Sequence, residues 1–214
     1  YHCYCTAEEL DRKRSEAQKA GNKPKYDGTC RERSDSTEGA PSVIRFKAPI
    51  EGTVVVEDLL RGKVVFDIAE LDDVIIQRTD GTPTYNFVVV VDDSEMGITH
   101  VIRGEDHVTN TAAQIELIAA IGGAAPEFAH FSLMLGADGS NLSKRIGSLS
   151  LQDLRGQGFE AMSLNSLIAR LGTADPVEPV QDMASLIAGF DISRLGRAPA
   201  RFDPEDVARL NARI

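Results

Sequence analysis

Three cysteines near the start of the chain have a spacing that suggests metal binding. Cys3 and Cys5 are separated by one residue, and Cys30 follows after a charged stretch and a turn. Three thiolates can form three corners of a tetrahedral Zn²⁺ site, whereas an odd number of cysteines is also typical of reduced structural thiols in a cytosolic protein. Both readings stay open from spacing alone. Three nearby side chains are candidates for the fourth corner: His2, Tyr26 and Glu32.

A second candidate is a glycine-bearing loop that ends in two cations. Residues 136–145 read Gly-Ala-Asp-Gly-Ser-Asn-Leu-Ser-Lys-Arg. A lysine on such a loop can reach the phosphates of a nucleotide and offset the charge that develops in phosphoryl transfer. Taken alone, Lys144 and Arg145 are more simply a solvated surface pair, so their meaning depends on the surrounding elements.

A third candidate is the polar turn at residues 104–107, Gly-Glu-Asp-His, which follows a short predicted strand at 100–103 that ends in Arg103. The helix expected next is capped by Thr109 or Asn110 and ends at Gly122-Gly123. This order of strand, polar turn and helix predicts that the turn lies at the carboxyl end of a strand, where ligands bind in doubly wound sheets.

Other elements are expected to position these residues. Thr6 and Glu9 form a capping-box signature, which predicts a charged helix over 7–20. Residues 42–91 read as β-rich, and the stretch 85–91, in which the run from Asn86 to Val91 shows no alternation, predicts a strand buried on both faces. Helices are then expected at 151–157, 160–171, 181–188 and 204–212. The pattern as a whole predicts an α/β fold.

Composition is that of a globular protein, with 42% hydrophobic and 26% charged residues. No apolar run approaches the ~20 residues that a membrane helix needs, so we expect no membrane association. The net charge of −10 argues against a nucleic-acid partner, but it is unevenly spread. Residues 1–50 hold 10 Lys and Arg against 8 Asp and Glu, so any RNA contact would be local.

Several stretches together resemble bacterial glutamyl-tRNA synthetases, a family within the class I aminoacyl-tRNA synthetases. Asn141-Leu-Ser-Lys-Arg145 is similar to the Lys-Met-Ser-Lys-Ser signature loop in its Lys-Leu-Ser-Lys-Arg form. The stretch 78–87 resembles the amino-acid-binding turn, 99–107 the second substrate-binding segment, and 165–172 the start of the stem-contact helices. The cysteines and the stretch from Tyr26 to Gly28 resemble the zinc-binding insertion of the acceptor-binding domain.

The resemblance implies a role for each matching residue. Lys144 would bind ATP and steady the transition state of glutamate activation. Glutamate would be bound by Tyr85, Arg103 and His107, and ATP also by Ser143, Arg145, Asp106 and Met134. Zn²⁺ would be held by Cys3, Cys5, Tyr26 and Cys30.

Two positions depart from the family pattern. Asn141 replaces the first lysine of the signature, which implies weaker charge stabilisation but not its loss, because Lys144 is retained. Glu32 stands where some relatives carry a histidine, which leaves Tyr26 as the implied fourth zinc ligand.

The resemblance implies a central part of a longer enzyme, without the His-x-Gly-His region before it or the anticodon-binding domain after it. Its parts would be an α+β acceptor-binding insertion (1–86), the second half of a Rossmann-type parallel sheet (87–135), and the signature loop with a helical stem-contact region (136–214). The implied enzyme is a cytoplasmic, monomeric glutamate–tRNA ligase that uses ATP and Mg²⁺. Its tRNA substrate would be tRNA(Glu), with tRNA(Gln) as a second candidate, and this chain by itself is expected to be inactive. Two alternatives remain: an enzyme like glutamyl-queuosine tRNA(Asp) synthetase, and a non-catalytic RNA-binding module.

Overall fold

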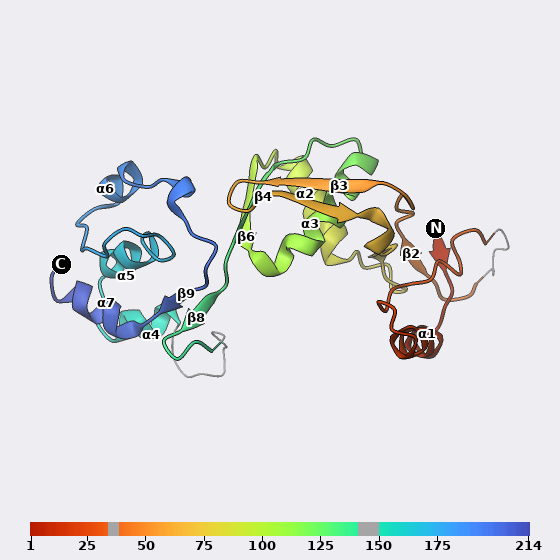
Figure 1. Cartoon of the computed structure of the whole chain (residues 1–214), viewed down its shortest axis with the longest axis horizontal. Coiled ribbons are helices and arrows are strands. Elements are labelled where there is room, and N and C mark those ends of the chain that lie inside the picture. The colour runs from red at the N-terminus through yellow and green to blue at the C-terminus, as the bar shows by residue number, and fades with distance from the viewer. Residues whose placement is uncertain (34–38, 141–149) are drawn as a thin grey trace. The chain divides into compact units, whose positions relative to one another are not determined.

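The computed structural model describes residues 1–33, 39–140 and 150–214 (Figure 1). The chain divides into two compact units. Unit 1 comprises Tyr1–Glu57, Lys63–Val101 and His107–Phe128, and unit 2 comprises Asp58–Gly62, Ile102–Asp106 and Ala129–Ile214.

Unit 1 begins with a small antiparallel sheet and the charged helix predicted after it. The sheet order is β1 (His2–Cys3), β2 (Val43–Arg45) and β5 (Ile75–Gln77). Helix α1 (Ala7–Lys19) starts at the predicted capping box: Thr6 Oγ1 accepts from the Glu9 backbone N–H at 3.2 Å, and Glu9 Oε2 accepts from the Thr6 N–H at 2.8 Å. No α1 residue is buried, as expected for a helix that is charged on nearly all sides.

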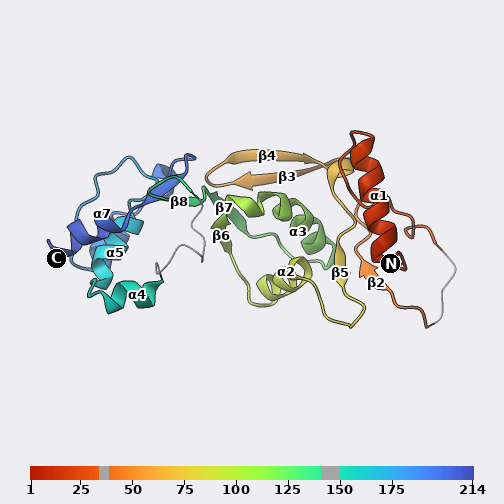
Figure 2. The ribbon, with the colours of Figure 1, turned by 90° about the horizontal axis from the view of Figure 1, so that it is seen from below.

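A longer sheet has the strand order β4-β3-β7-β6. Its members are β3 (Thr53–Asp58), β4 (Gly62–Asp67), β6 (His100–Gly104) and β7 (Glu127–Phe131). Figure 2 shows β3 and β4 running side by side. Alternate residues of β3 are buried, so that Val54, Val56 and Asp58 share one face. An aspartate thus lies on the buried face of a strand.

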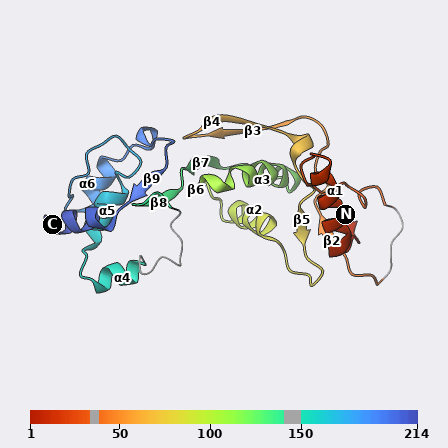
Figure 3. The ribbon, with the colours of Figure 1, turned by 60° about the horizontal axis from the view of Figure 1, so that its bottom comes forward.

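The strand predicted at 85–91 is wrong: this run forms helix α2 (Tyr85–Glu95). A short apolar run without alternation fits a buried strand or a buried helix equally well, and here the helix continues through the polar residues 92–95. Val90 of α2 packs against Leu117 and Ile118 of α3 (Val108–Ala120), and the two helices lie alongside each other in Figure 3. Asp92 and Asp93 therefore lie within a helix and not at a strand end.

The predicted cap of α3 is also wrong. The N-cap residue is His107, because the 3-10 turn η2 (Glu105–His107) leads directly into the helix. Asn110 instead contacts His107 Nδ1 through Nδ2 at 3.1 Å.

Unit 2 contains a parallel pair of short strands and the helices predicted in the last third of the chain (Figure 1). The elements are β8 (Met134–Gly136), α4 (Leu151–Gly156), α5 (Ala161–Ile168), α6 (Met183–Ala188), β9 (Ala200–Phe202) and α7 (Pro204–Asn211). The core of this part is formed by Leu167, Phe202, Val207 and Leu210. Within the described ranges, no helix has the length and apolar character that crossing a membrane requires.

Candidate functional site

The three cysteines come together in unit 1. Cys3 ends β1, Cys5 precedes the cap of α1, and Cys30 lies in the loop after α1. Their Sγ atoms all lie within 4.8 Å of one another, and Cys5 Sγ is 3.7 Å from Cys30 Sγ. All three are free thiols, and Cys3 and Cys30 are buried.

The Tyr26 hydroxyl lies beside these thiols and forms a cluster of four side chains with them. Its Oη atom lies 3.3 Å from Cys3 Sγ and 4.0 Å from Cys5 Sγ, and it accepts a hydrogen bond from the Cys30 backbone N–H at 2.9 Å. The guanidinium of buried Arg45 stacks on its ring, with Cζ 3.8 Å from the ring centroid. The Tyr26 side chain is therefore held by a hydrogen bond at its hydroxyl and by stacking on its ring.

The dimensions of this group fit a tetrahedral zinc ion. Bonds of about 2.3 Å to sulfur and about 2.0 Å to oxygen give S···S edges near ~3.8 Å and S···O edges near ~3.5 Å. The 3.7 Å separation of the Cys5 and Cys30 sulfurs matches the first edge, and the two distances from Tyr26 Oη bracket the second. The other two candidates make different contacts, since Glu32 pairs with Lys47 at 3.0 Å and His2 Nδ1 lies 2.9 Å from Ser42 Oγ.

The thiols differ in their tendency to ionise. Burial alone would raise the pKa of Cys3, but hydrogen bonds with Tyr26 and Arg45 outweigh it and lower that pKa to about 7. Burial, together with a hydrogen bond to Cys30, raises the pKa of Cys5 to about 11. Burial and the contact with Cys3 also raise the pKa of Tyr26. Negative charge is thus more stable on Cys3 than on Cys5.

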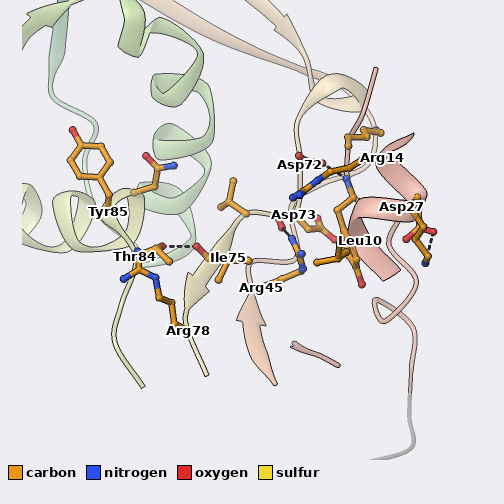
Figure 4. A pocket seen from close by; sticks show the side chains of 15 residues that line it. Leu10, Arg14, Asp27, Arg45, Asp72, Asp73, Ile75, Arg78, Thr84 and Tyr85 are labelled. Carbon is orange, nitrogen blue, oxygen red and sulfur yellow. Dashed lines mark hydrogen bonds and ion pairs between the residues drawn. The ribbon is translucent and has the colours of Figure 1, made fainter. Parts of the chain in front are cut away.

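A pocket of about 380 Å³ extends from the cluster to the first turn of α2 (Figure 4). Tyr26 and Arg45 line one part of it, and Thr84 and Tyr85 line another. Thr84 Oγ1 donates to the Ile75 carbonyl at 2.5 Å, which ties the start of α2 to β5. The lining carries both signs of charge, and Lys13 pairs with Asp27 at 2.8 Å.

Two of the residues expected to bind glutamate meet in unit 1. Tyr85 is the first residue of α2, and its ring centroid lies 5.9 Å from that of His107 with the ring planes at 48°. Tyr85 is 54% exposed, so its ring is accessible to a ligand.

Arg103, Asp106 and Met134 belong to unit 2. Arg103 lies on β6, Asp106 in η2, and Met134 is the first residue of β8. Arg103 is at the carboxyl end of its strand, as predicted. Its Nε–H donates to His130 Nε2 at 3.2 Å.

His130 and its partner Asp58 were missed by sequence reasoning. Their side chains are fully buried, and His130 Nδ1 lies 2.6 Å from Asp58 Oδ2. Burial lowers the pKa of His130 below its usual value despite the adjacent carboxylate. Burial would raise the pKa of Asp58, but hydrogen bonds from His130 and two backbone N–H groups lower it. The alternation of β3 was a signal for Asp58, because it places this residue on the same face as Val54 and Val56.

The signature loop lies outside the described residues. This applies to Asn141, Ser143, Lys144 and Arg145. The described chain stops just before them in a turn, where the Ser140 backbone N–H and Oγ both donate to Asp138 Oδ1, at 2.9 and 2.7 Å.

The mixed α/β fold matches that of class I synthetase catalytic domains. The chain belongs to the family of class I tRNA synthetases (E and Q), whose catalytic-domain model matches residues 1–209. A crystal structure of a glutamate tRNA ligase from Elizabethkingia meningosepticum, in complex with its amino acid, has a TM-score of 0.85 and 32% identity. That alignment covers 100% of this chain and 49% of the other.

Individual relatives are more similar in sequence. The glutamate–tRNA ligase of Citrifermentans bemidjiense is 51% identical over 213 residues, which are 99% of this chain and 46% of that protein. The glutamate–tRNA ligase of Trichlorobacter lovleyi is 49% identical over 212 residues, again 99% of this chain and 46% of the relative. The chain thus spans about half the length of the curated relatives it matches.

Proposed function

We propose that the protein carrying this chain ligates L-glutamate to tRNA(Glu) with ATP and Mg²⁺. The observation that carries the proposal is a sequence identity of 49% and 51%, over 99% of the chain, with two relatives named glutamate–tRNA ligase. In the first step, a glutamate α-carboxylate oxygen attacks the α-phosphorus of ATP, forming glutamyl-adenylate and releasing pyrophosphate. In the second step, a hydroxyl of the terminal ribose of the tRNA attacks the activated carbonyl carbon and releases AMP.

The glutamate site is proposed to use Arg103, Tyr85 and His107. A guanidinium offers two parallel donors to a carboxylate, which a lysine ammonium cannot do. The position of Arg103 at the carboxyl end of β6 and the accessibility of Tyr85 support this assignment.

The ATP site is proposed to use Lys144, Ser143 and Arg145 of the signature loop together with Asp106 and Met134. Lys144 would stabilise the negative charge that develops on the phosphates as pyrophosphate leaves.

A structural Zn²⁺ is proposed at Cys3, Cys5, Tyr26 and Cys30. The spacing of the three sulfurs and the phenol oxygen supports this ligand set. The metal would cross-link β1 to the loop after α1, so its contribution would be to folding.

The remaining features are proposed from the family likeness. They are an acceptor-binding insertion over 1–86, a catalytic half-domain over 87–135, a stem-contact region over 136–214, and a cytoplasmic monomer. The three free thiols support a reducing compartment. Charging of tRNA(Gln) is the second substrate option.

Two other functions predict different products. An enzyme like glutamyl-queuosine tRNA(Asp) synthetase would form the same adenylate but attach glutamate to a modified base of tRNA(Asp). A non-catalytic RNA-binding module would bind tRNA and exchange no pyrophosphate.

The decisive experiment measures glutamate-dependent ATP–pyrophosphate exchange in the full-length protein with tRNA present, followed by charging of purified tRNA(Glu), tRNA(Gln) and tRNA(Asp). We expect exchange and charging of tRNA(Glu), and loss of about 10²-fold or more in kcat for Lys144→Ala. Lys63→Ala, at an exposed position of β4, is the charge-matched control. Exchange that is unchanged in Lys144→Ala would contradict the role of the loop, and the 214-residue chain alone is expected to show none.

A further inference from the structure

Two buried polar side chains, His130 and Asp58, form a hydrogen-bonded series that ends at Arg103. His130 Nε2 accepts from Arg103 Nε–H at 3.2 Å, and His130 Nδ1 lies 2.6 Å from Asp58 Oδ2. All three residues belong to unit 2, and they come from three strands, β6, β7 and β3. The side chains of Asp58 and His130 are 1% and 0% exposed.

The hydrogen-bond donors and acceptors of Asp58, His130 and Arg103 permit one protonation pattern. An arginine Nε–H can only donate, so His130 Nε2 must be the unprotonated nitrogen. An ionised carboxylate can only accept, so the proton of the neutral imidazole is on Nδ1. Burial, which lowers the pKa of His130, keeps the ring neutral in this tautomer.

Asp58 is itself fixed by the turn between β3 and β4. Its Oδ1 accepts from the backbone N–H groups of Leu60 at 2.9 Å and Arg61 at 2.8 Å. The same oxygen lies 3.4 Å from the His130 backbone N–H. Because Oδ1 is engaged in this way, Oδ2 is the oxygen that faces the imidazole.

We propose that Asp58 and His130 are positioning residues for Arg103: Asp58 selects the histidine tautomer, and His130 fixes the plane of the guanidinium toward the substrate carboxylate. This inference rests on the proposed function for the identity of the carboxylate, but the hydrogen-bond relay itself does not. Neither residue touches the reacting atoms, so their loss should affect glutamate more than ATP.

Asp58→Asn is the sharpest test because it changes one oxygen to NH₂ at constant shape. The two backbone N–H groups retain the amide oxygen, so the new NH₂ faces His130 Nδ1. The imidazole must then carry its proton on Nε2, which opposes Arg103 Nε–H with a second donor. We expect the KM for glutamate in exchange by the full-length protein to rise at least about tenfold, while the KM for ATP stays within about twofold.

Substitutions at His130 separate its two contacts. In His130→Asn, the shorter amide can still donate to Asp58 but does not reach Arg103, so the KM for glutamate should rise. In His130→Gln, the amide oxygen can accept from Arg103 Nε–H, which should restore part of the loss. His100→Asn is the matched control, since His100 is an exposed histidine at the start of β6.

A double-mutant cycle shows whether the effect passes through arginine. In an Arg103→Lys background there is no Nε–H to orient, so Asp58→Asn should add less than about twofold to the KM for glutamate. Equal effects of Asp58→Asn in both backgrounds would overturn the proposal. An unchanged KM for glutamate in the Asp58→Asn variant, when Arg103→Lys does impair the protein, would also overturn it.

A second readout does not depend on activity. Nitrogen NMR of histidine-labelled full-length protein should show His130 protonated on Nδ1, and Asp58→Asn should move the proton to Nε2. Failure of the wild-type protein to activate glutamate would contradict the proposed function, whereas the NMR tautomer would still decide the relay. A His130 protonated on Nε2 in the wild-type protein would refute it.

Discussion

Replacement of Tyr26 by phenylalanine tests the proposed zinc ligand set with the removal of one oxygen. That oxygen lies 3.3 Å from Cys3 Sγ and 4.0 Å from Cys5 Sγ, and it accepts from the Cys30 backbone N–H. The ring and its stacking with Arg45 would be retained. Any change in metal binding therefore reports on the hydroxyl group.

The size of the effect follows from the strength of structural zinc sites. Apparent binding free energies of about 10–16 kcal/mol, divided over four ligands, give about 2.5–4 kcal/mol for each ligand. Loss of one ligand should then weaken zinc binding by about 60- to 700-fold, at about 1.4 kcal/mol for each factor of ten. A hydroxyl that only donated a hydrogen bond to a thiolate would account for about 10- to 100-fold, which overlaps the lower part of this range.

Two measurements on the full-length protein resolve the overlap. Competition with a chromophoric chelator gives the zinc affinity, and X-ray absorption of the zinc-loaded protein gives its ligands. We expect three sulfur scatterers near ~2.3 Å and one oxygen near ~2.0 Å in the wild type, with the outer-shell carbon signal of a phenolate. That signal should vanish in Tyr26→Phe.

The control variant is Tyr4→Phe, which removes a hydroxyl from the same segment. Tyr4 stacks on His2 and lies under Arg33, contacts that the phenylalanine ring would retain. Zinc affinity within about threefold of wild type in Tyr26→Phe would refute Tyr26 as a ligand, because even an outer-shell partner accounts for about tenfold.

Three further changes test other parts of the molecule. His130 has a pKa below the usual ~6.5. As the pH falls, this histidine therefore binds a proton in the unfolded state before it does so in the folded state. The free energy of unfolding should then decrease below pH ~6.5, by up to about 1.4 kcal/mol per pH unit. In His130→Gln this contribution should be absent from urea unfolding curves compared between pH 7 and pH 5, and an unaltered pH dependence would contradict it. Leu117→Ala should lower the free energy of unfolding by about 2–5 kcal/mol, since Leu117 is 2% exposed between α2 and α3, whereas Ile121→Ala, at a 44% exposed position, should change it by about 1 kcal/mol or less. Asn141→Lys restores the family's first loop cation and should raise kcat for pyrophosphate exchange, so an unchanged or lower kcat would show that this position contributes no charge stabilisation.

Local signals in the sequence predicted the elements that local interactions determine. The capping box of Thr6 and Glu9 specified the start of α1, because both of its hydrogen bonds join residues three apart. The stretch at 85–91 carried no such signal. As a helix, it packs Val90 against α3, a contact between segments distant in sequence.

The two sites differ in the same way. Three cysteines within the first 30 residues predicted the thiol cluster. The structure brings their sulfurs within 4.8 Å of one another. His130 was isolated in the sequence, but its partners lie 72 and 27 residues away, at Asp58 and Arg103. Isolation along the chain is therefore a poor guide to a histidine held between strands.

The position of the Asp58–His130 pair argues for a role beyond stability. Removing an ionised carboxylate from water costs several kcal/mol, and an apolar pair of similar volume is often at least as stable. Here the cost is offset by the imidazole and by backbone N–H groups of the β3–β4 turn. What such a network gains over an apolar pair is a defined geometry, since each donor has one acceptor to face. That geometry ends at Arg103 Nε, so the sheet itself supplies a contact that directs the guanidinium.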